Sequence, residues 1–288
     1  MKFLVTGANG LVGRAVVQLC IASNDEVFAC DHRTLDITDA AAIKAMMERA
    51  CPDALINCAA LTDVDGCEVN HERALEVNAY APEKLAAACR SAGAVFVTIS
   101  TDYVFDGAKD GFYTQRDDPN PLSVYAATKL EGERRAQAAC ARTIVVRTGW
   151  IFGTGGTNFL SRVIELAEHG AHLKVIHDAF GTPTASRDLA RRLRELAVLD
   201  LPGIYHVTNS GEGVSYEEFA RAAIAAAGGD AAMLESVSIN ELRRPAPRPR
   251  NSRLQCLISE PFGLAPLPFW RDALKDFAVE THDAKSSV

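Results

Sequence analysis

The sequence predicts an α/β fold with a doubly wound parallel sheet. Short apolar segments alternate with helical segments five times within the first 147 residues, a rhythm typical of a parallel sheet with helices on both faces. The apolar segments are continuous, as expected for strands buried on both sides. After residue 152 the rhythm changes, which indicates a second, smaller C-terminal unit. The chain of 288 residues is long enough for both.

The first predicted strand, Lys2 to Thr6, runs directly into a glycine turn. Gly7, Gly10 and Gly13 lie three residues apart, and an amphipathic helix is expected from Leu11 to Ala22. In this setting the glycines permit a tight turn, close approach of a pyrophosphate and close helix–strand packing. The helix N-terminus then offers N–H groups to phosphate. The pattern predicts a Rossmann unit that binds a dinucleotide cofactor, whereas the simpler alternative is a plain strand-to-helix turn.

The next strand, Glu26 to Cys30, ends at an acidic residue. Asp31 lies 18 residues after Gly13, where a carboxylate can accept hydrogen bonds from an adenosine ribose. Arg33 follows it and suits a 2′-phosphate. Because the two residues favour NAD and NADP respectively, the sequence leaves the choice of NADH or NADPH open.

Two further βα units follow. Thr38 or Asp39 is expected to cap a helix ending near Ala50, and the strand after it, residues 52–60, ends in small residues that let a flat ring approach the backbone. Asn78 then falls within a helix expected over residues 72–92. Its side chain either bonds to the local backbone or has a functional role.

The fourth strand, residues 94–99, ends in the polar segment Ser100-Thr101-Asp102-Tyr103. Ligands bind outside the carboxyl ends of the strands in such sheets, so Thr101 is a candidate to bind a carbonyl group. The segment from Phe105 to Pro121 is rich in Gly, Asp and Pro and is expected to be a loop.

A helix opening at Ser123 carries Tyr125 and Lys129, which are four residues apart and therefore share one helix face. A neighbouring ammonium favours the phenolate and is expected to lower the pKa of Tyr125, making it a usable proton donor. The simpler alternative is a half-buried aromatic ring beside a solvated lysine.

A fifth strand, residues 143–147, precedes the change of rhythm. We expect residues 1–152 and 184–209 to form the cofactor-binding domain, and residues 153–183 and 210–288 to form the smaller, substrate-binding domain. In the latter, residues 243–252 hold closely spaced arginines and prolines. Such an extended loop suits an anionic ligand, although it could instead be a solvated linker.

Composition excludes several functions. The net charge of −7 argues against nucleic-acid binding, and no apolar run approaches the length of a membrane span. The eight cysteines include no C-x-x-C pair and the seven histidines are scattered, so we expect reduced thiols and no protein-bound metal. No signal peptide is evident after Met1, and a cytoplasmic location is expected.

Several motifs together carry a resemblance. Thr6-Gly7-x-x-Gly10-x-x-Gly13, Ser100-Thr101 and Tyr125-x3-Lys129 occur in this order, and the set resembles the extended short-chain dehydrogenase/reductases. Longer stretches at residues 57–65, 100–107, 147–150 and 248–254 resemble the dTDP-4-dehydrorhamnose reductase family. Within these stretches, Gly149 stands where that family often has serine.

The resemblance implies roles by position. Tyr125 would be the proton donor, Lys129 would hold the nicotinamide ribose, and Thr101 would take the place of the usual catalytic serine. Thr101, Asp102 and Trp150 would bind the sugar nucleotide, with Arg248 and Asn251 in the loop at its distal part. The NAD(P)H site would be lined by Gly10, Leu11, Val12, Asp31, Asp36, Ile37, Ala59, Ala60 and Leu61.

The implied activity is the NAD(P)H-dependent reduction of dTDP-4-dehydro-β-L-rhamnose, the last step of dTDP-rhamnose synthesis. An epimerase or dehydratase acting on another nucleotide sugar is an alternative, as is a non-catalytic, nucleotide-binding regulatory subunit. The presence of Tyr125, Lys129 and Thr101 together argues against pure binding. A homodimer and dependence on a divalent metal are both left open.

Overall fold

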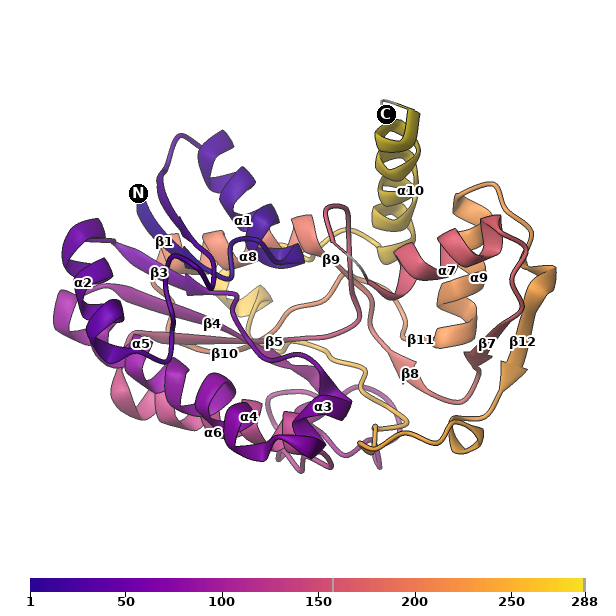
Figure 1. The fold of residues 1–288 in the computed structure, drawn as a ribbon, viewed down its shortest axis with the longest axis horizontal. Coiled ribbons are helices and arrows are strands. Elements are labelled where there is room, and N and C mark those ends of the chain that lie inside the picture. The colour runs from indigo at the N-terminus through magenta and orange to yellow at the C-terminus, as the bar shows by residue number, and fades with distance from the viewer. Residues whose placement is uncertain (157, 287–288) are drawn as a thin grey trace.

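A computed structural model describes residues 1–156 and 158–286, with side chains described as far as Thr281. At its centre lies a six-stranded sheet in the order β10-β5-β4-β3-β1-β2 (Figure 1), and all of its pairings are parallel. The strands are β1 (Lys2–Thr6), β2 (Glu26–Cys30), β3 (Ala54–Asn57), β4 (Val95–Thr101), β5 (Thr143–Thr148) and β10 (Gly203–His206). The predicted doubly wound sheet is confirmed.

Helices cover both faces of the sheet. On one face α1 (Leu11–Ala22) and α8 (Ser186–Leu199) pack through buried aliphatic side chains. On the other face lie α2 (Ala40–Ala50), α5 (Ala81–Ala92) and α6 (Val124–Ala139). Side-chain caps begin two of them as expected: Asp39 accepts from the N–H groups of Ala41 and Ala42, and Ser123 accepts from Ala126.

The order of the strands determines where a ligand can enter. From β1 the chain moves outward to β2, and then returns to the opposite side of β1 with β3. Connections leave β1 and β3 in opposite directions, so a crevice opens at the carboxyl ends of these strands. The glycine turn follows β1, and the small residues of the 52–60 segment follow β3.

One predicted helix has a different form. The helix expected over residues 72–92 is present as α4 (His71–Leu75), a π-helical turn (Glu76–Tyr80) and α5, which follow one another without a break, and a short helix α3 (Val64–Val69) precedes it. The turn contains Asn78, whose side-chain amide bonds both the N–H and the carbonyl of Leu61 at 2.9 and 3.0 Å. Of the two alternatives for Asn78, the bond to the local backbone is not the one formed: its side chain bonds distant backbone and ties the loop after β3 to the helix.

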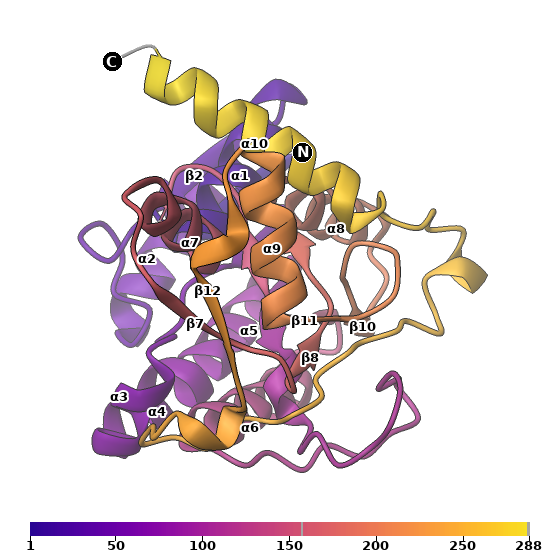
Figure 2. The same ribbon diagram turned by 90° about the vertical axis from the view of Figure 1, so that its right-hand side faces the viewer.

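The C-terminal part packs its own apolar core at the other end of the molecule, as Figures 1 and 2 show. Phe152, Phe219, Trp270 and Phe277 are buried together there. Its elements are α7 (Phe159–Glu168), β7 (Leu173–Ile176), β8 (Phe180–Gly181), β11 (Val214–Ser215), α9 (Tyr216–Ala226), β12 (Leu234–Val237) and α10 (Trp270–Ser286). The short strands β6 (Ile151–Phe152) and β9 (Thr184–Ala185) pair with each other next to it. Within the described ranges, no helix has the length and apolar character that crossing a membrane requires.

Candidate active site

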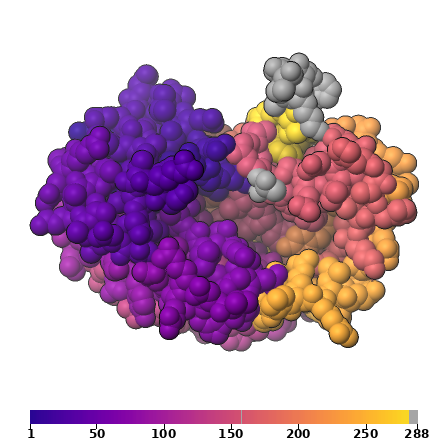
Figure 3. Space-filling model, in the orientation of Figure 1, coloured from indigo at the N-terminus to yellow at the C-terminus, as the bar shows by residue number. Residues whose placement is uncertain are grey.

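A cavity of about 580 Å³ opens at the carboxyl ends of β1, β3 and β4 and is closed on its far side by α7 and α9. The surface is hollowed at this place, between the N-terminal and C-terminal parts of the chain (Figure 3). The structure brings most of the predicted site residues to this cavity. Those that line it are Gly10, Leu11, Val12, Gly13, Ala59, Ala60, Thr101, Asp102, Tyr125, Lys129 and Trp150.

The glycine turn forms one wall of the cavity. Gly7 has a φ of +65°, which only glycine adopts without strain. A Cβ on Gly13 would lie 2.1 Å from the carbonyl oxygen of Gly7, so this position requires the smallest side chain. Helix α1 begins after Gly10 with no side-chain cap and no acidic residue in its first turn. Its N–H groups are therefore free to bind an anion.

Asp31 and its neighbours lie beyond this cavity lining. The Asp31 carboxylate accepts from Asn9 Nδ2 at 2.6 Å and from the backbone N–H of Arg33 at 3.0 Å. Desolvation acts to raise the pKa of Asp31, but hydrogen bonds from Arg33 and Thr34 outweigh it and lower the pKa. Other predicted cofactor residues outside the lining are Gly7, Arg33, Asp36, Ile37 and Leu61.

Lys129 is held by the end of β4. Its Nζ donates to the carbonyl oxygen of Ile99 at 2.7 Å, and the side chain is buried. Burial lowers the pKa of Lys129 to about 8, although Glu133 and Cys58 act to raise it. This side chain can therefore change charge close to neutral pH.

For Tyr125 the direction of the pKa shift differs from the prediction. Burial raises the pKa of Tyr125 above its ordinary value, while a hydrogen bond with Thr101 acts to lower it. The expected lowering of this pKa by Lys129 is not found: burial is the largest influence, and the hydrogen bond with Thr101, not Lys129, is what opposes it. Tyr125 is thus neutral at physiological pH and carries the proton that an acid needs.

Asp102 is a buried carboxylate beside these groups. Its Oδ1 accepts from the hydroxyl of Thr101 at 3.1 Å, and its Oδ2 has no hydrogen-bond partner. Burial raises the pKa of Asp102 to about 6, although hydrogen bonds from Ser252 and Thr101 oppose the shift. A Cβ at residue 149 would lie 2.3 Å from the Asp102 carboxyl carbon. Gly149 therefore makes the space in which this carboxylate is buried.

This burial predicts that Asp102→Asn stabilises the protein. Each pKa unit corresponds to about 1.4 kcal/mol, so a rise from 3.8 to about 6 destabilises the folded, ionised form by about 3 kcal/mol. Above pH 6 both folded and unfolded Asp102 are ionised, and the full penalty is present. Below about pH 4 both are protonated and it disappears. Thermal unfolding at a series of pH values should show the variant several degrees more stable at pH 7.5, with the difference shrinking as the pH falls through 6.

Asp106→Asn is the matched control, because hydrogen bonds from Ala108, Asn120 and Tyr113 lower the pKa of Asp106. This substitution should reduce stability at pH 7.5. Lower stability of Asp102→Asn at that pH would contradict the account given for Asp102.

Aromatic side chains form the far wall of the cavity. Trp150 stacks on Tyr216 with ring centroids 3.7 Å apart, and its indole lies against Gly181, where a Cβ would overlap the ring. Its backbone has a φ of +51°, a strained conformation for a large side chain. The buried indole N–H has no hydrogen-bond partner. The Tyr216 hydroxyl lies 3.4 Å from that of Tyr103.

Sequence reasoning missed several of these side chains. Tyr103 directly follows Asp102, so its position just after β4 could have predicted that it lines the cavity. Tyr216 and Phe219 come from α9, and no local pattern links that helix to the sheet.

The arginine-proline loop is tied to α3 and does not line the cavity. Arg248 makes a bidentate ion pair with Asp65 at 2.9 Å, and the N–H of Ala246 also donates to that carboxylate. Hydrogen bonding to Arg248 lowers the pKa of Asp65 to about 2. Asn251 donates to the carbonyl oxygens of Lys109 and Gly111. Arg248 and Asn251, both predicted to bind the substrate, are therefore bonded to other parts of the protein outside the cavity lining.

Helix α3 also supports the helix that carries Tyr125. The carboxylate of Glu68 accepts from the N–H of Val124 at 2.7 Å, next to the Ser123 cap. A carboxylate at a helix N-terminus is a favourable interaction with the helix dipole. Glu68 on α3 therefore helps to hold the first turn of the helix that carries Tyr125.

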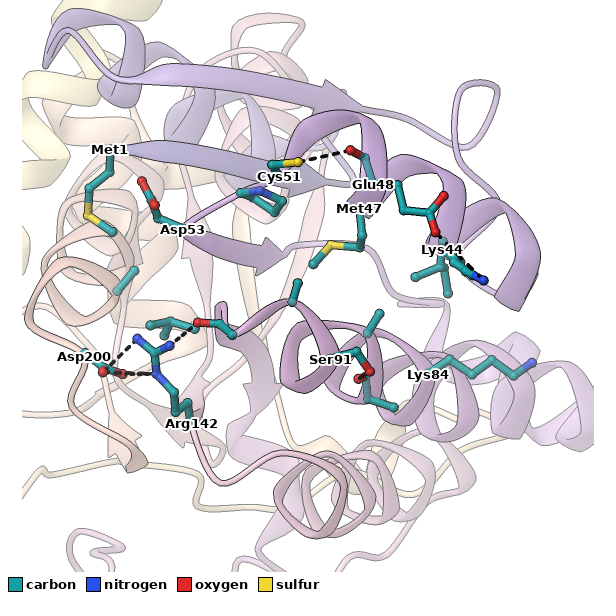
Figure 4. Close-up of a pocket in the computed structure, with 18 of the residues that line it drawn as sticks. Met1, Lys44, Met47, Glu48, Cys51, Asp53, Lys84, Ser91, Arg142 and Asp200 are labelled. Atoms are coloured by element: carbon teal, nitrogen blue, oxygen red, sulfur yellow. Dashed lines mark hydrogen bonds and ion pairs between the residues drawn. The ribbon is translucent and has the colours of Figure 1, made fainter.

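A larger cavity, of about 1140 Å³, lies between α2 and α5 at the opposite end of the sheet (Figure 4). Arg142 there is paired with Asp200 at 2.9 Å, and Lys84 donates to the carbonyl oxygen of Thr38. None of the predicted site residues lines it. This cavity is the larger of the two. Tyr125, Lys129 and the N-terminus of α1, however, all lie at the smaller one. Across the described residues, no group of three or more His, Cys, Asp or Glu side chains is arranged to hold a metal.

The fold, the glycine turn and the Tyr125–Lys129 helix define an extended short-chain dehydrogenase/reductase. The model of the RmlD substrate binding domain matches residues 1–282, and the chain belongs to that family. A dTDP-4-dehydrorhamnose reductase of Streptomyces griseus is 38% identical over 281 residues, which cover 96% of this chain and 92% of that protein.

Two solved structures are also similar. The dTDP-4-dehydrorhamnose reductase of Clostridium acetobutylicum is 38% identical with a TM-score of 0.94, covering 98% of this chain and 100% of that one. The Bacillus anthracis enzyme of the same name, in complex with NADP, is 32% identical with a TM-score of 0.93, covering 97% of this chain and 100% of that one.

Proposed function

We propose that this protein reduces dTDP-4-dehydro-β-L-rhamnose to dTDP-β-L-rhamnose with NADPH or NADH, the last step of dTDP-rhamnose biosynthesis. The observation that carries the proposal is the meeting of Thr101, Tyr125 and Lys129 in one cavity with the free N-terminus of α1. Relatives named dTDP-4-dehydrorhamnose reductase, similar over nearly the whole chain, support the same reaction and sugar.

The residues present fit a dinucleotide. The uncapped N-terminus of α1 offers N–H groups for a pyrophosphate, and Gly10 and Gly13 leave room for it. Ala59 and Ala60 provide a flat wall after β3, and Lys129 would hold the nicotinamide ribose. Asp31 would bind the adenosine ribose from outside the cavity lining, and Arg33 would meet a 2′-phosphate. When bound, the cofactor supplies the hydride.

The chain's own groups act on the ketone oxygen of the sugar. Thr101, whose hydroxyl donates to Asp102 in this structure, would turn to donate to that oxygen, where negative charge develops during reduction. Tyr125, kept neutral by burial, gives its proton to that oxygen. Lys129 places a positive charge near the site below about pH 8. Because burial strengthens electrostatic interactions, this charge favours the developing alkoxide.

The sugar nucleotide would lie against the C-terminal part of the chain. Asp102 and Trp150 offer a carboxylate and an unpartnered indole N–H to the sugar. We assign residues 1–152 and 184–209 to cofactor binding, and residues 153–183 and 210–288 to the sugar nucleotide. Arg248 and Asn251 would act at the distal end of the sugar nucleotide.

A cytoplasmic location and a homodimer belong to the same proposal. Light scattering of the purified protein tests the dimer.

Oxidation of NADPH and NADH by the purified protein tests the function. The ketone substrate is dTDP-4-keto-6-deoxyglucose, supplied with and without the epimerase that converts it to the rhamnose precursor. We expect oxidation with the epimerase present and little without it. Equal rates in both arms would assign the protein to a different keto sugar. No oxidation with either cofactor would support a non-catalytic binding role.

A further inference from the structure

A charged cluster lies beneath the active site, buried between α6, β4 and β5. The carboxylate of Glu133 accepts from Arg147 Nε at 3.0 Å and from Arg147 Nη2 at 2.7 Å. The hydroxyl of Ser100 donates to the same carboxylate. The side chains of Arg147 and Glu133 are only 5% and 1% exposed, so the pair is removed from water.

Stability alone does not account for such a pair. Transferring two charges out of water carries a large desolvation penalty, and apolar side chains of similar size often stabilise a core as well or better. The cluster is nevertheless closely fitted. Ser100 and Arg147 are directly opposite each other in the β4–β5 pairing, and the Arg147 guanidinium lies over the ring of Phe105.

The cluster is connected to the reacting groups by position. Along α6, Tyr125, Lys129 and Glu133 follow one another at four-residue intervals, so they lie on one helix face. Lys129 bonds the carbonyl oxygen of Ile99, and Glu133 bonds the hydroxyl of the next residue, Ser100. The residue after that is Thr101. Two consecutive residues of β4 are thus tied to α6 immediately before the strand delivers Thr101 to the cavity.

We propose that Glu133, together with Arg147 and Ser100, is a positioning residue that sets the spacing between Thr101 on β4 and the Tyr125–Lys129 pair on α6. Its ties to β4 and β5 prevent α6 from sliding along the sheet. The inference rests on the proposed reductase function for its effect on turnover, but its effect on Lys129 is independent of any substrate.

The negative charge of Glu133 is a second link between the cluster and Lys129. Burial is the main influence on Lys129 and lowers its pKa, while Glu133 on its own helix and Cys58 at the end of β3 act in the opposite direction. Arg147 on β5 is the remaining charged group of the cluster and is paired with Glu133. Without the carboxylate, Lys129 would lose its proton at a lower pH.

Glu133→Gln tests the proposal, with Glu131→Gln as the matched control. Glu131 lies on the same helix and pairs with Arg135 at the exposed surface. We expect Glu133→Gln to lower kcat by about 10- to 100-fold, since small displacements of reacting groups have effects of this size. The KM for NADPH should remain close to that of the wild type, and the alkaline limb of kcat should move about one pH unit lower. Glu131→Gln should change none of these.

The double variant Glu133→Leu/Arg147→Met separates positioning from folding. Removing both charges should preserve the melting temperature. Glu133→Gln, in contrast, leaves the buried Arg147 without its carboxylate and should lower the melting temperature. We expect the double variant to fold and still show low kcat. Wild-type kcat and an unchanged pH profile in this variant would overturn the proposal.

Titration of Lys129, followed by NMR of ¹³C-labelled lysine and assigned with Lys129→Arg, needs no substrate. A lower Lys129 pKa in both Glu133 variants supports the inference, and an unchanged value overturns it. If the wild-type protein reduced no nucleotide sugar, the proposed function would fail, and this titration would still decide the inference.

Discussion

Replacing Tyr125 with phenylalanine should remove most of the turnover and leave cofactor binding intact. A positioned acid contributes about 10²- to 10⁴-fold to a rate, and kcat should fall by that factor. The phenyl ring keeps the buried contacts of Tyr125, including the edge-to-face contact with Tyr103 at 6.4 Å. NADPH affinity, measured by fluorescence titration, and the melting temperature should therefore change little.

Tyr103→Phe is the control for this experiment, because it removes a neighbouring hydroxyl that also lines the cavity. That hydroxyl contacts Tyr216 and has no part in the proposed proton transfer. Its removal should have a much smaller effect on kcat. Normal turnover by Tyr125→Phe would mean that another group supplies the proton.

Gly13→Ala should have the largest effect on stability. The added Cβ would lie 2.1 Å from the Gly7 carbonyl oxygen, 2.7 Å from the Gly7 carbonyl carbon and 2.9 Å from the Cα of Ala8. All three are backbone atoms of the turn, so α1 must move away from β1. We expect a loss of about 3 kcal/mol or more, together with loss of NADPH binding. Thermal unfolding and fluorescence titration measure the two effects.

Gly10→Ala provides the comparison within the same turn. Its Cβ would lie 3.2 Å from the Gly7 carbonyl oxygen, a contact that a small adjustment relieves, and its φ of −77° suits alanine. This variant should remain folded but bind NADPH more weakly, because the methyl group occupies the path of the pyrophosphate. Equal melting temperatures for the two variants would refute the steric account of Gly13.

The strands and helices around the glycine turn were predictable because each is specified by neighbouring residues. β1, α1 and β2 have the predicted boundaries, and Asp39 and Ser123 cap their helices as expected. Continuous apolar runs identify buried parallel strands, and polar residues before an apolar period identify helix starts.

The π-helical turn at Asn78 was not predictable in the same way. In that turn the Asn78 side chain makes two hydrogen bonds to the backbone of Leu61, which lies in a loop 17 residues earlier. The very short strands β6, β8, β9 and β11 likewise arise from pairing with distant segments. Two-residue strands carry too little periodicity to be read from sequence.

By itself, the sequence determined the parallel sheet, the glycine turn at its switch point, and the placing of Tyr125 and Lys129 on one helix face. Each of these is signalled by patterns of residues within short stretches of the chain. Only the tertiary structure decided the direction of the Tyr125 pKa, which desolvation raises. It also decided the pairing of Arg248 with Asp65, 183 residues away. Burial and long-range pairing depend on which segments pack together, and no local pattern specifies that packing.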